Sequence, residues 1–421
     1  MYLEIAKSFP LADRNRRWIL VVGGGLLQMP VLEEARKMGL KTIVTDLSPT
    51  CACAQAADYF LPIDVFDVKG HVRLVLTLRA LNVNICGVMV AGIDATITGA
   101  IVARTLGLPG VDPLAAFLCK HKPAMRARLQ SAGLPVPRWA EVETSADVEE
   151  ALREVGFPCI VKNTDSSASR GTKRFFARPS NMEEFFRAVE DAREVSASKT
   201  ALIEELWRGP EQTVETLFDI SHRFWPCFIT DRLFADDGPN ALEIGLEHPT
   251  RLDAATQQSL YEAVRQAAEV LGITVGAAKA DTILTKDGPR IIEMTTRLSG
   301  GFDCQYLVPA ATGKNIIRAA LLTCLGKPVD PLDLQDWKHR FAVSGSVWPG
   351  PGVVRRISGI EEARALPGIE GVFLRCKPGD EVRDYKDCAA RVCFVIASDH
   401  TREGARQKLD RSLNTIRIET Q

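Results

Sequence analysis

Two acidic residues, Asp281 and Glu293, lie 12 residues apart in the segment KADTILTKDGPRIIEM (279–294). The segment reads as two short strands joined by a turn at Asp287-Gly288, and antiparallel pairing can bring both carboxylates onto one face. Carboxylates that face each other repel unless a cation lies between them. Because Mg²⁺ selects hard oxygen ligands and bridges phosphate groups, the pair predicts a magnesium site beside a phosphorylated ligand.

A lysine followed by a small polar loop predicts a second contact with phosphate. Lys162 lies near the end of the apolar run PCIVKN (158–163), which we interpret as a buried strand, and the loop TDSSASRGT follows. Its ammonium could meet phosphate oxygens while backbone N–H groups and hydroxyls of the loop wrap the terminal phosphate. The loop residues that we expect at the phosphates are Ser166, Ser167, Ser169, Arg170 and Gly171. The alternative is a polar surface hairpin.

A glycine turn near the N-terminus imitates a dinucleotide-binding motif. GGG (23–25) follows the apolar run WILVV, and Asp46 follows the next apolar run. A dinucleotide fingerprint needs a third glycine where the helix contacts the strand, and Gln28 occupies that position. We interpret the turn as one that leads a strand into a helix or touches a substrate. A nicotinamide-dependent oxidoreductase is the alternative that this motif would support.

Four segments, in this order, together resemble the ATP-grasp superfamily. They are KHKPAMRARLQSAGLPVP (120–137), GFPCIVKNTDSSASRGTKRF (156–175), ALIEELWRGPEQTVETL (201–217) and KADTILTKDGPRIIEMTTRLSGG (279–301). Taken one by one, most of these charged residues would be read as solvated surface charges. The resemblance implies that the chain binds ATP and Mg²⁺ or Mn²⁺, with two ions expected.

The resemblance implies roles for further residues around ATP. Lys122, which precedes Gly133 by 11 residues, matches a lysine that contacts phosphate, with Lys120 as its competitor. Glu204 matches an acid at the adenine amino group, and Glu205 and Leu206 match the hinge that follows it.

Two more residues of the same ATP site follow from the match. Glu211 corresponds to the acid that accepts hydrogen bonds from the ribose hydroxyls, a task that a carboxylate suits. Lys279 could add a further phosphate contact.

The fourth segment resembles the E-x-N-x-R signature of the superfamily. Glu293 and Arg297 match it, whereas Thr295 stands where asparagine is usual and Asp281 where glutamate is commoner. A threonine hydroxyl can still coordinate a cation, so the expected metal residues are Asp281, Glu293 and Thr295. Arg297 offers a planar fork for the transferred phosphate or the acyl phosphate.

Within the superfamily the chain resembles the amino-acid ligases, which join a carboxylic acid to an amine. Glu243 in ALEIGLEHP aligns with an acid directed at the active site, and Leu246 replaces a histidine common at that place. The region VSGSVWPGPGVVRRISGIEEARALPGIEGVFLRCKPGDEV (343–382) resembles the extra domain of these ligases and of related carboxylases.

The resemblance implies activation of a carboxylate as an acyl phosphate, capture by an amine, and release of ADP and phosphate. The expected catalytic residues are Arg297, Glu243 and Arg170. Positioning and charge neutralisation would supply most of the catalysis. One alternative is a biotin-carboxylase-like enzyme that activates bicarbonate, and another is a non-catalytic nucleotide-binding subunit.

The elements that must position these residues follow from apolar runs and their spacing. Runs at 18–25, 40–46 and 85–92 alternate with helical patterns at 29–39 and 95–107, which predicts a parallel, doubly wound sheet over residues 16–115. One basic helix is expected over 117–133. Helices are expected at 145–156, 180–194 and 255–272.

The predicted fold class is α/β, with an α+β grasp. We expect a Rossmann-like domain over 1–115, a two-lobed ATP-grasp domain over 116–335 with a mobile lid lobe at about 138–206, and a small α+β domain over 336–421.

Composition limits the remaining function classes. The chain has 421 residues, a net charge of −1 and scattered cysteines, so neither nucleic acid nor a disulfide framework is expected. Residues 1–18 lack the apolar run of a signal peptide, and no apolar stretch is long enough to cross a membrane. The expected location is the cytoplasm and the expected partners are a small-molecule carboxylate and an amine. The resemblance is also compatible with a homodimer.

Overall fold

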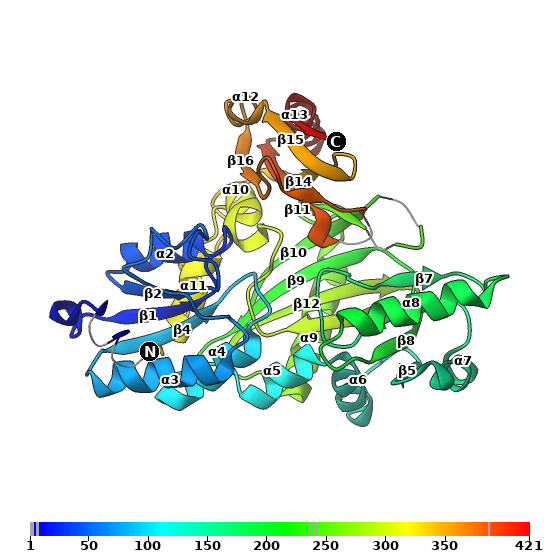
Figure 1. Ribbon diagram of the computed structural model, residues 1–421, viewed down its shortest axis with the longest axis horizontal. Helices are drawn as coiled ribbons and strands as arrows, with labels where there is room; N and C mark the ends of the chain where they lie inside the picture. Colours follow the sequence, from blue (N-terminus) through cyan, green and yellow to red (C-terminus); the bar gives the residue numbers. More distant parts are fainter. Residues whose placement is uncertain (1–3, 6–7, 236–237, 241, 386–387) are drawn as a thin grey trace.

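The protein is a mixed α/β molecule, seen here as a computed structural model that describes residues 4–5, 8–235, 238–240, 242–385 and 388–421. Four sheets make up its framework. The N-terminal sheet lies at one end and a small antiparallel sheet at the other, with a large sheet between them and the C-terminal region above (Figure 1). The predicted α/β class is confirmed, while the signal-peptide prediction rests partly on residues 1–3 and 6–7, outside the described residues.

The N-terminal sheet is parallel, as predicted. Its strands are ordered β3 (Tyr59–Leu61), β2 (Lys41–Thr45), β1 (Trp18–Val22) and β4 (Ile85–Val90). Side chains alternate along β1, so Ile19 and Val21 pack toward one face and Leu20 and Val22 toward the other. The first face is covered by α2 (Met29–Lys37) and α11 (Ile316–Cys324), and the second by α3 (Val68–Ala80) and α4 (Thr96–Leu106).

The single helix expected over 117–133 is wrong, because two helices occupy this region. They are α5 (Pro113–Lys120) and α6 (Lys122–Ser131), separated at His121, whose backbone is extended (φ −98°, ψ 99°). Pro123 has no N–H to continue the hydrogen bonds of α5, but it fits the first turn of a new helix. The break places Lys122 at the start of α6, where it is buried.

A small antiparallel sheet forms the lobe over residues 139–205. Its strands are ordered β5 (Trp139–Val142), β8 (Ala201–Glu205), β6 (Cys159–Asn163) and β7 (Lys173–Phe175). The helices α7 (Val148–Val155) and α8 (Met182–Val195) pack against it, with Phe185 of α8 in the core beside Val161 and Ile203.

The large sheet has eight strands in the order β13, β12, β9, β10, β11, β14, β18, β16. Their bounds are β13 (Gly288–Thr295), β12 (Gly276–Thr285), β9 (Glu211–Phe218), β10 (Phe224–Phe234), β11 (Glu243–His248), β14 (Phe341–Val347), β18 (Cys393–Asp399) and β16 (Ile369–Leu374). The helix α9 (Ala254–Leu271) packs on β9, β12 and β13, and α10 (Val308–Thr312) lies near β14. The sheet therefore continues from the predicted grasp domain into the C-terminal region.

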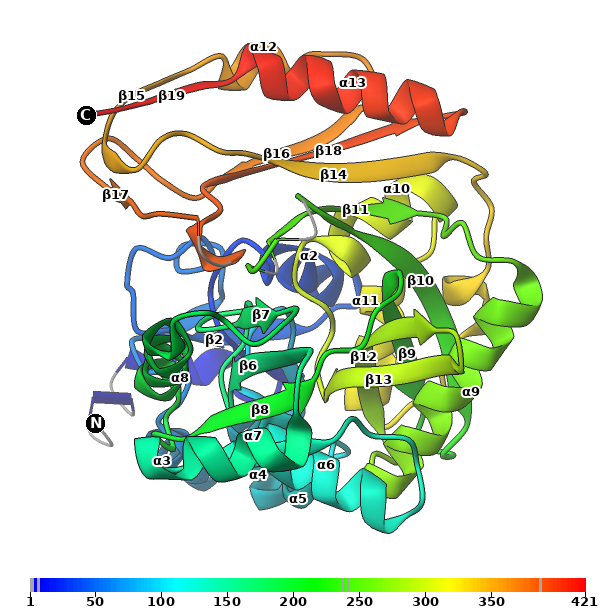
Figure 2. The ribbon, with the colours of Figure 1, turned by 90° about the vertical axis from the view of Figure 1, so that its right-hand side faces the viewer.

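The C-terminal region is attached to the large sheet by strand pairing and by charge. Strands β11 and β14 pair at Glu247–Val343 and His248–Ala342. Buried Glu247 accepts hydrogen bonds from Arg402 and Arg406 of α13 (Arg402–Thr415). Figure 2 shows α13 and α12 (Ile360–Arg364) lying over the strands of this region. The predicted domain boundaries stay predictions.

The remaining elements are short. A three-stranded sheet is ordered β17 (Glu381–Val382), β15 (Gly352–Ser358) and β19 (Arg417–Thr420). Single helical turns lie at Leu11–Asp13, Ser145–Asp147, Pro331–Leu334 and Cys388–Ala390, and a π-helical turn at Asp303–Leu307. Within the described residues, none of the helices is both long and apolar enough to span a bilayer.

Candidate functional site

A single large cavity of about 790 Å³ collects most of the residues singled out in the sequence. All of those residues are described, and the cavity wall includes Lys122, Lys162, Ser166, Ser167, Ser169, Arg170, Glu204, Glu205, Leu206, Glu211, Glu243, Lys279, Asp281, Glu293 and Arg297. Two of the residues predicted to belong to the site, Gly171 and Thr295, are described by the structure but are not part of this wall. The wall also includes Gly25 and Asp94 of the first predicted domain and Arg391 of the third, so residues from all three predicted domains line one site of the size that small-molecule ligands occupy.

The two acids of the β12–β13 hairpin lie opposite each other. Asp281 pairs in register with Glu293, and Lys279 pairs with Thr295 two residues along, so all four side chains start on one face. Lys279 Nζ lies 2.6 Å from Asp281 Oδ1, and Lys122 Nζ lies 3.7 Å from Glu293 Oε2. Each carboxylate thus has a lysine of its own, which compensates the repulsion between the two acids.

The Asp281 carboxylate is held in its charged form. It is buried, which would raise its pKa, but Arg232 and Lys279 outweigh burial and lower the pKa below its usual value. Thr213 Oγ1 donates a further hydrogen bond to Asp281 Oδ1 at 3.0 Å. The residue therefore presents an ionised oxygen ligand in a buried place.

Lys162 is oriented by a buried ion triad. Its Nζ donates to Glu204 Oε2 at 2.7 Å, while Arg126 Nε donates to Glu204 Oε1 at 2.5 Å. Burial alone would raise the pKa of Glu204, but Arg126 and Lys162 lower it to about 2. Two cations share one carboxylate, so the triad offers one positive charge to a phosphate. A contact of Glu204 with adenine stays a prediction.

Of the hinge residues, Glu205 ends β8 and Leu206 directly follows it. Glu205 N–H donates to Arg138 O at 2.8 Å, and Leu206 N–H donates to Pro158 O at 3.1 Å. Both backbone donors are therefore used within the protein, which leaves the carbonyl groups of this segment to meet an adenine edge. The adenine role of the hinge stays a prediction.

Asn163, a residue that the sequence did not single out, shapes the polar loop after β6. Its Oδ1 accepts from Ser166 N–H at 2.6 Å and its Nδ2 donates to Arg170 O at 2.6 Å. Lys122 Nζ donates to Asn163 Oδ1 at 3.2 Å and to Ser166 O at 2.8 Å. One amide thus closes the loop and links it to the lysine of α6.

The loop tip has a conformation that non-glycine residues adopt at a cost. Ala168 (φ 62°) and Ser169 (φ 56°) are both left-handed, as is Gly171 (φ 62°). A Cβ on Gly171 would lie 2.8 Å from Ala192 Cα of α8. This glycine therefore permits close packing of the loop on α8, and its contact with ATP stays a prediction.

Arg232 of β10 links three acids of the site, Glu211, Glu243 and Asp281, the last at 3.8 Å. Its Nη1 donates to Glu211 Oε2 and its Nε donates to Glu243 Oε2, both at 2.7 Å. Glu243 also accepts from Arg391 at 3.1 Å. Burial would raise the pKa of Glu243, but Arg232 and Arg391 lower it, so this acid is ionised and already paired on both oxygens. Its catalytic role stays a prediction.

Arg297 connects the signature strand to the N-terminal sheet. Its Nη2 donates to Asp94 Oδ1 at 3.1 Å, whereas its buried Nε has no hydrogen-bond partner among the described residues. Asp94 comes shortly after β4, at the carboxyl end of the parallel sheet, where ligands of such sheets bind. Arg297 thus keeps one donor for a group that enters the cavity.

The glycine turn at 23–25 already uses backbone N–H groups that could otherwise bind a pyrophosphate. Gly24 N–H donates to Asp46 Oδ2 at 2.9 Å, and Gly25 N–H donates to Gln28 Oε1 at 2.8 Å. These donors are those that a dinucleotide-binding turn directs at its ligand. Gly25 and Gln28 nevertheless line the cavity, which favours the interpretation that this turn touches a substrate.

The donor set suits a cation that phosphate groups help to bind. Within the described residues there is no group of three or more His, Cys, Asp or Glu side chains arranged around a metal site. Asp281 and Glu293 are oxygen ligands of the kind that Mg²⁺ accepts together with phosphate oxygens and water. The cysteines of the chain are unpaired thiols.

Comparisons with known proteins identify the family of this site. Residues 129–302 match the family model of the D-ala D-ala ligase C-terminus, and residues 347–421 match L-amino acid ligase C-terminal domain 2. D-alanine–D-alanine ligase of Pseudomonas fluorescens is 30% identical over 224 residues, covering 52% of this chain and 66% of that enzyme.

Carnosine synthase 1 of Mus musculus is 26% identical over 335 residues, and the match covers 73% of this chain but only 39% of that longer protein. The crystal structure of L-amino acid ligase from Bacillus licheniformis is 25% identical, with a TM-score of 0.82, over 97% of this chain and 99% of that one. These relatives all join a carboxylate to an amine. The chain is therefore a member of the ATP-grasp superfamily, of the carboxylate–amine ligase type.

Proposed function

We propose that this protein phosphorylates the carboxylate of an amino acid with ATP and condenses the acyl phosphate with an amine, releasing ADP and phosphate. The observation that carries the proposal is the hairpin pair Asp281 and Glu293, which lies with Lys162 in one cavity. Similarity to D-alanine–D-alanine ligase, L-amino acid ligase and carnosine synthase supports an amino acid as one substrate.

In this proposal Asp281 and Glu293 would hold Mg²⁺, which would supply positive charge to the phosphates of ATP. A second ion, with Thr295 as a further oxygen donor, and Mn²⁺ in place of Mg²⁺ belong to the same proposal. Lys122 and Lys162, each fixed by hydrogen bonds to neighbouring groups, contact phosphate oxygens. The serine loop covers the phosphates and excludes water from the acyl phosphate.

The remaining predicted residues have places in the same scheme. Glu205 and Leu206 meet adenine, Glu211 meets ribose, and Lys279 adds a phosphate contact. Arg297 is fixed by Asp94 and keeps a free Nε–H, so it binds the acyl phosphate and the oxyanion that forms when the amine attacks. Glu243 and Arg170 line the same chamber. A cytoplasmic homodimer belongs to the proposal as well.

The test is a panel of amino acids and amines incubated with ATP and Mg²⁺, with ADP, AMP, phosphate and pyrophosphate measured separately. We expect ADP and phosphate in equal amounts, and only when an acceptable acid and amine are both present. AMP with pyrophosphate would contradict the proposal. Turnover with bicarbonate as the only carboxylate would replace it by the carboxylase-like alternative.

A further inference from the structure

An arginine of the C-terminal region reaches the cavity without a partner. Arg375 directly follows β16 and lines the cavity wall together with Arg391 and Phe394. Arg391 is paired with Glu243 at 3.1 Å. The Arg375 guanidinium, by contrast, has no ion pair or hydrogen bond with any of the described residues, and it lies 5.9 Å from the centre of the Phe394 ring. The Arg375 residue as a whole is exposed, but desolvation of its guanidinium beside the cavity wall, with Arg391 nearby, lowers its pKa, as expected for a cation that lacks an anion.

A buried acid lines the same cavity with an unused oxygen. Asp303 is 1% exposed, and its Oδ1 has no hydrogen-bond partner among the described residues. A buried carboxylate oxygen without a donor is costly, and a ligand that enters the cavity could supply the missing partner. Burial, followed by the negative charge of Glu243, raises the pKa of Asp303, and a cation at its free oxygen would relieve both effects.

The backbone at Asp303 is held in an unusual shape. Phe302 is left-handed (φ 68°), and Asp303 begins the π-helical turn Asp303–Leu307. Both features are rare and concentrate at functional sites. The Phe302 ring stacks on Phe373 at 4.1 Å, which fixes the strained residue and with it the direction of Asp303.

The two charged residues belong to one wall. The Phe302 ring lies 5.3 Å from Phe394, the ring over which Arg375 is placed, so an aromatic surface separates the negative group from the positive one. A molecule with an ammonium group and an anionic group on a short carbon frame would pair with both. An amine without an anionic group would not form the ion pair with Arg375, so an amine that carries a negative charge is favoured.

We propose that Asp303 and Arg375 form the subsite for the amine substrate, Asp303 accepting its ammonium group and one proton, and Arg375 binding its anionic group. The inference rests on the proposed function, to which it adds the two residues that select an amine bearing a negative charge. The C-terminal region thereby takes part in substrate choice.

In the chemical step the amine replaces phosphate at the acyl carbon, with charge and atoms conserved. Ammonium gives one proton to the Asp303 carboxylate, and the nitrogen lone pair then attacks the acyl carbon. The C–N bond forms, the bond from carbon to the phosphate oxygen breaks, and the phosphate leaves with that electron pair. The second nitrogen proton goes to the departing phosphate, which leaves a neutral amide. Burial raises the pKa of Asp303 well above its usual value, which makes it a stronger base than an exposed aspartate.

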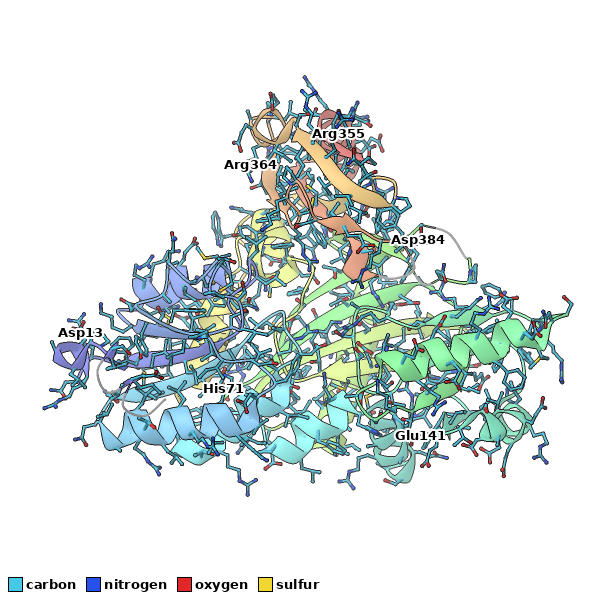
Figure 3. The ribbon with its side chains drawn as sticks, viewed as in Figure 1. Asp13, His71, Glu141, Arg355, Arg364 and Asp384 are labelled. Carbon is cyan, nitrogen blue, oxygen red and sulfur yellow. The ribbon has the colours of Figure 1, made fainter. Side chains whose placement is uncertain are left out.

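The test separates acid activation from amine capture. Hydroxylamine, a small nucleophile that is neutral at pH 7, traps the acyl phosphate as a hydroxamate and needs neither Asp303 nor Arg375. The rate of hydroxamate formation is compared with the rate of ligation when α- and β-amino acids serve as the amine substrate. Each amino acid is assayed next to its carboxamide, which has the same amine but no anionic group. The variants are Asp303→Asn, Arg375→Gln and Arg375→Lys, with Arg355→Gln as the matched control, because Arg355 is exposed at the outer end of the C-terminal region (Figure 3).

We expect Asp303→Asn to lose about 100-fold in ligation rate relative to hydroxamate formation, the scale of a missing general base. Arg375→Gln should raise KM for the amino acid about 10-fold or more and abolish the preference over the carboxamide, with partial rescue in Arg375→Lys. Arg355→Gln should match the wild type.

Different outcomes overturn different claims. The proposed subsite would be overturned if the Asp303 and Arg375 variants lost hydroxamate formation and ligation equally, or if their ligation rates did not change. It would also be overturned if the wild-type enzyme accepted carboxamides as readily as amino acids. A wild-type enzyme that forms no hydroxamate with any acid would instead overturn the proposed function itself.

Discussion

The carboxylates of Asp281 and Glu293 start from register-paired positions of β12 and β13, yet each is matched with a different lysine. Lys279 belongs to the same strand as Asp281, whereas Lys122 comes from the first turn of α6. The pair of acids is therefore already compensated within the protein, and a cation that binds there shares the carboxylates with two ammonium groups. This arrangement links the metal ligands to the residues that we expect at the phosphates.

The first prediction concerns Glu293. Glu293→Gln keeps the shape of the side chain and removes its charge, so the proposed Mg²⁺ would lose one ionised ligand and would be held less firmly at the phosphates. We expect turnover to fall about 100-fold or more, the scale of losing one electrostatic contact in a catalytic site. The control is Glu149→Gln on the exposed face of α7. Wild-type turnover in Glu293→Gln at every Mg²⁺ concentration would refute the metal assignment.

The second prediction concerns the triad around Glu204. Glu204→Ala leaves Arg126 and Lys162 buried without their shared anion, so we expect the free energy of unfolding to fall by about 3–5 kcal/mol. Urea unfolding measures it. In Glu205→Ala the loss should stay below about 1 kcal/mol, because its ion pair with Arg138 at 3.6 Å is largely exposed. Similar losses in both variants would show that the triad is not a stabilising unit.

The third prediction concerns Glu215, a fully buried acid of β9 whose Oε2 accepts from Ser299 N–H at 2.8 Å. Burial raises its pKa from 4.5 to about 7. Between these values the folded protein binds a proton that the unfolded chain lacks, so raising the pH through this window lowers the free energy of unfolding.

Glu215→Gln keeps a hydrogen-bond acceptor and removes the titration. Between pH 4.5 and pH 7 we expect the free energy of unfolding of the wild type to fall by about 2–3 kcal/mol more than that of this variant. Urea unfolding at several pH values measures the difference. Parallel pH profiles for the two proteins would show that the buried carboxyl group does not titrate in this window.

The fourth prediction concerns Gly171 in the polar loop. Gly171→Ala introduces a left-handed alanine and a contact of 2.8 Å with Ala192 Cα, so the loop must move away from α8. We expect the free energy of unfolding to fall by about 2–4 kcal/mol and the KM for ATP to rise. Gly39→Ala is the control, since Gly39 is also left-handed (φ 73°) but no atom lies within 4 Å of the added Cβ. Equal losses in both variants would mean that packing on α8 is unimportant.

Local patterns in the sequence predicted much of the fold and the hairpin at its centre. A turn between two strands sets the register of its own hairpin, so the spacing of Asp281 and Glu293 could be interpreted without knowledge of the rest of the chain. The parallel N-terminal sheet followed in the same way from apolar runs and helical spacing.

The contacts that local patterns could not predict join distant segments. Arg126 reaches Glu204 across 78 residues and Arg297 reaches Asp94 across 203. A lone arginine in a helix reads as a surface charge, because its burial depends on elements far along the chain. Pro123 marks the break at His121, and the expectation of one helix over 117–133 did not take this proline into account. The continuation of the large sheet through β11 and β14 rests on two residue pairs, too few to mark in a sequence.

The most direct test of the account follows the oxygen atoms of the acid. An amino acid labelled with ¹⁸O in its carboxylate is ligated with ATP and an amine, and the released phosphate is examined by mass spectrometry. If an acyl phosphate forms, one labelled oxygen passes from the carboxylate to the phosphate. Unlabelled phosphate formed together with the amide, with the second labelled oxygen found in water or in AMP, would contradict the central claim.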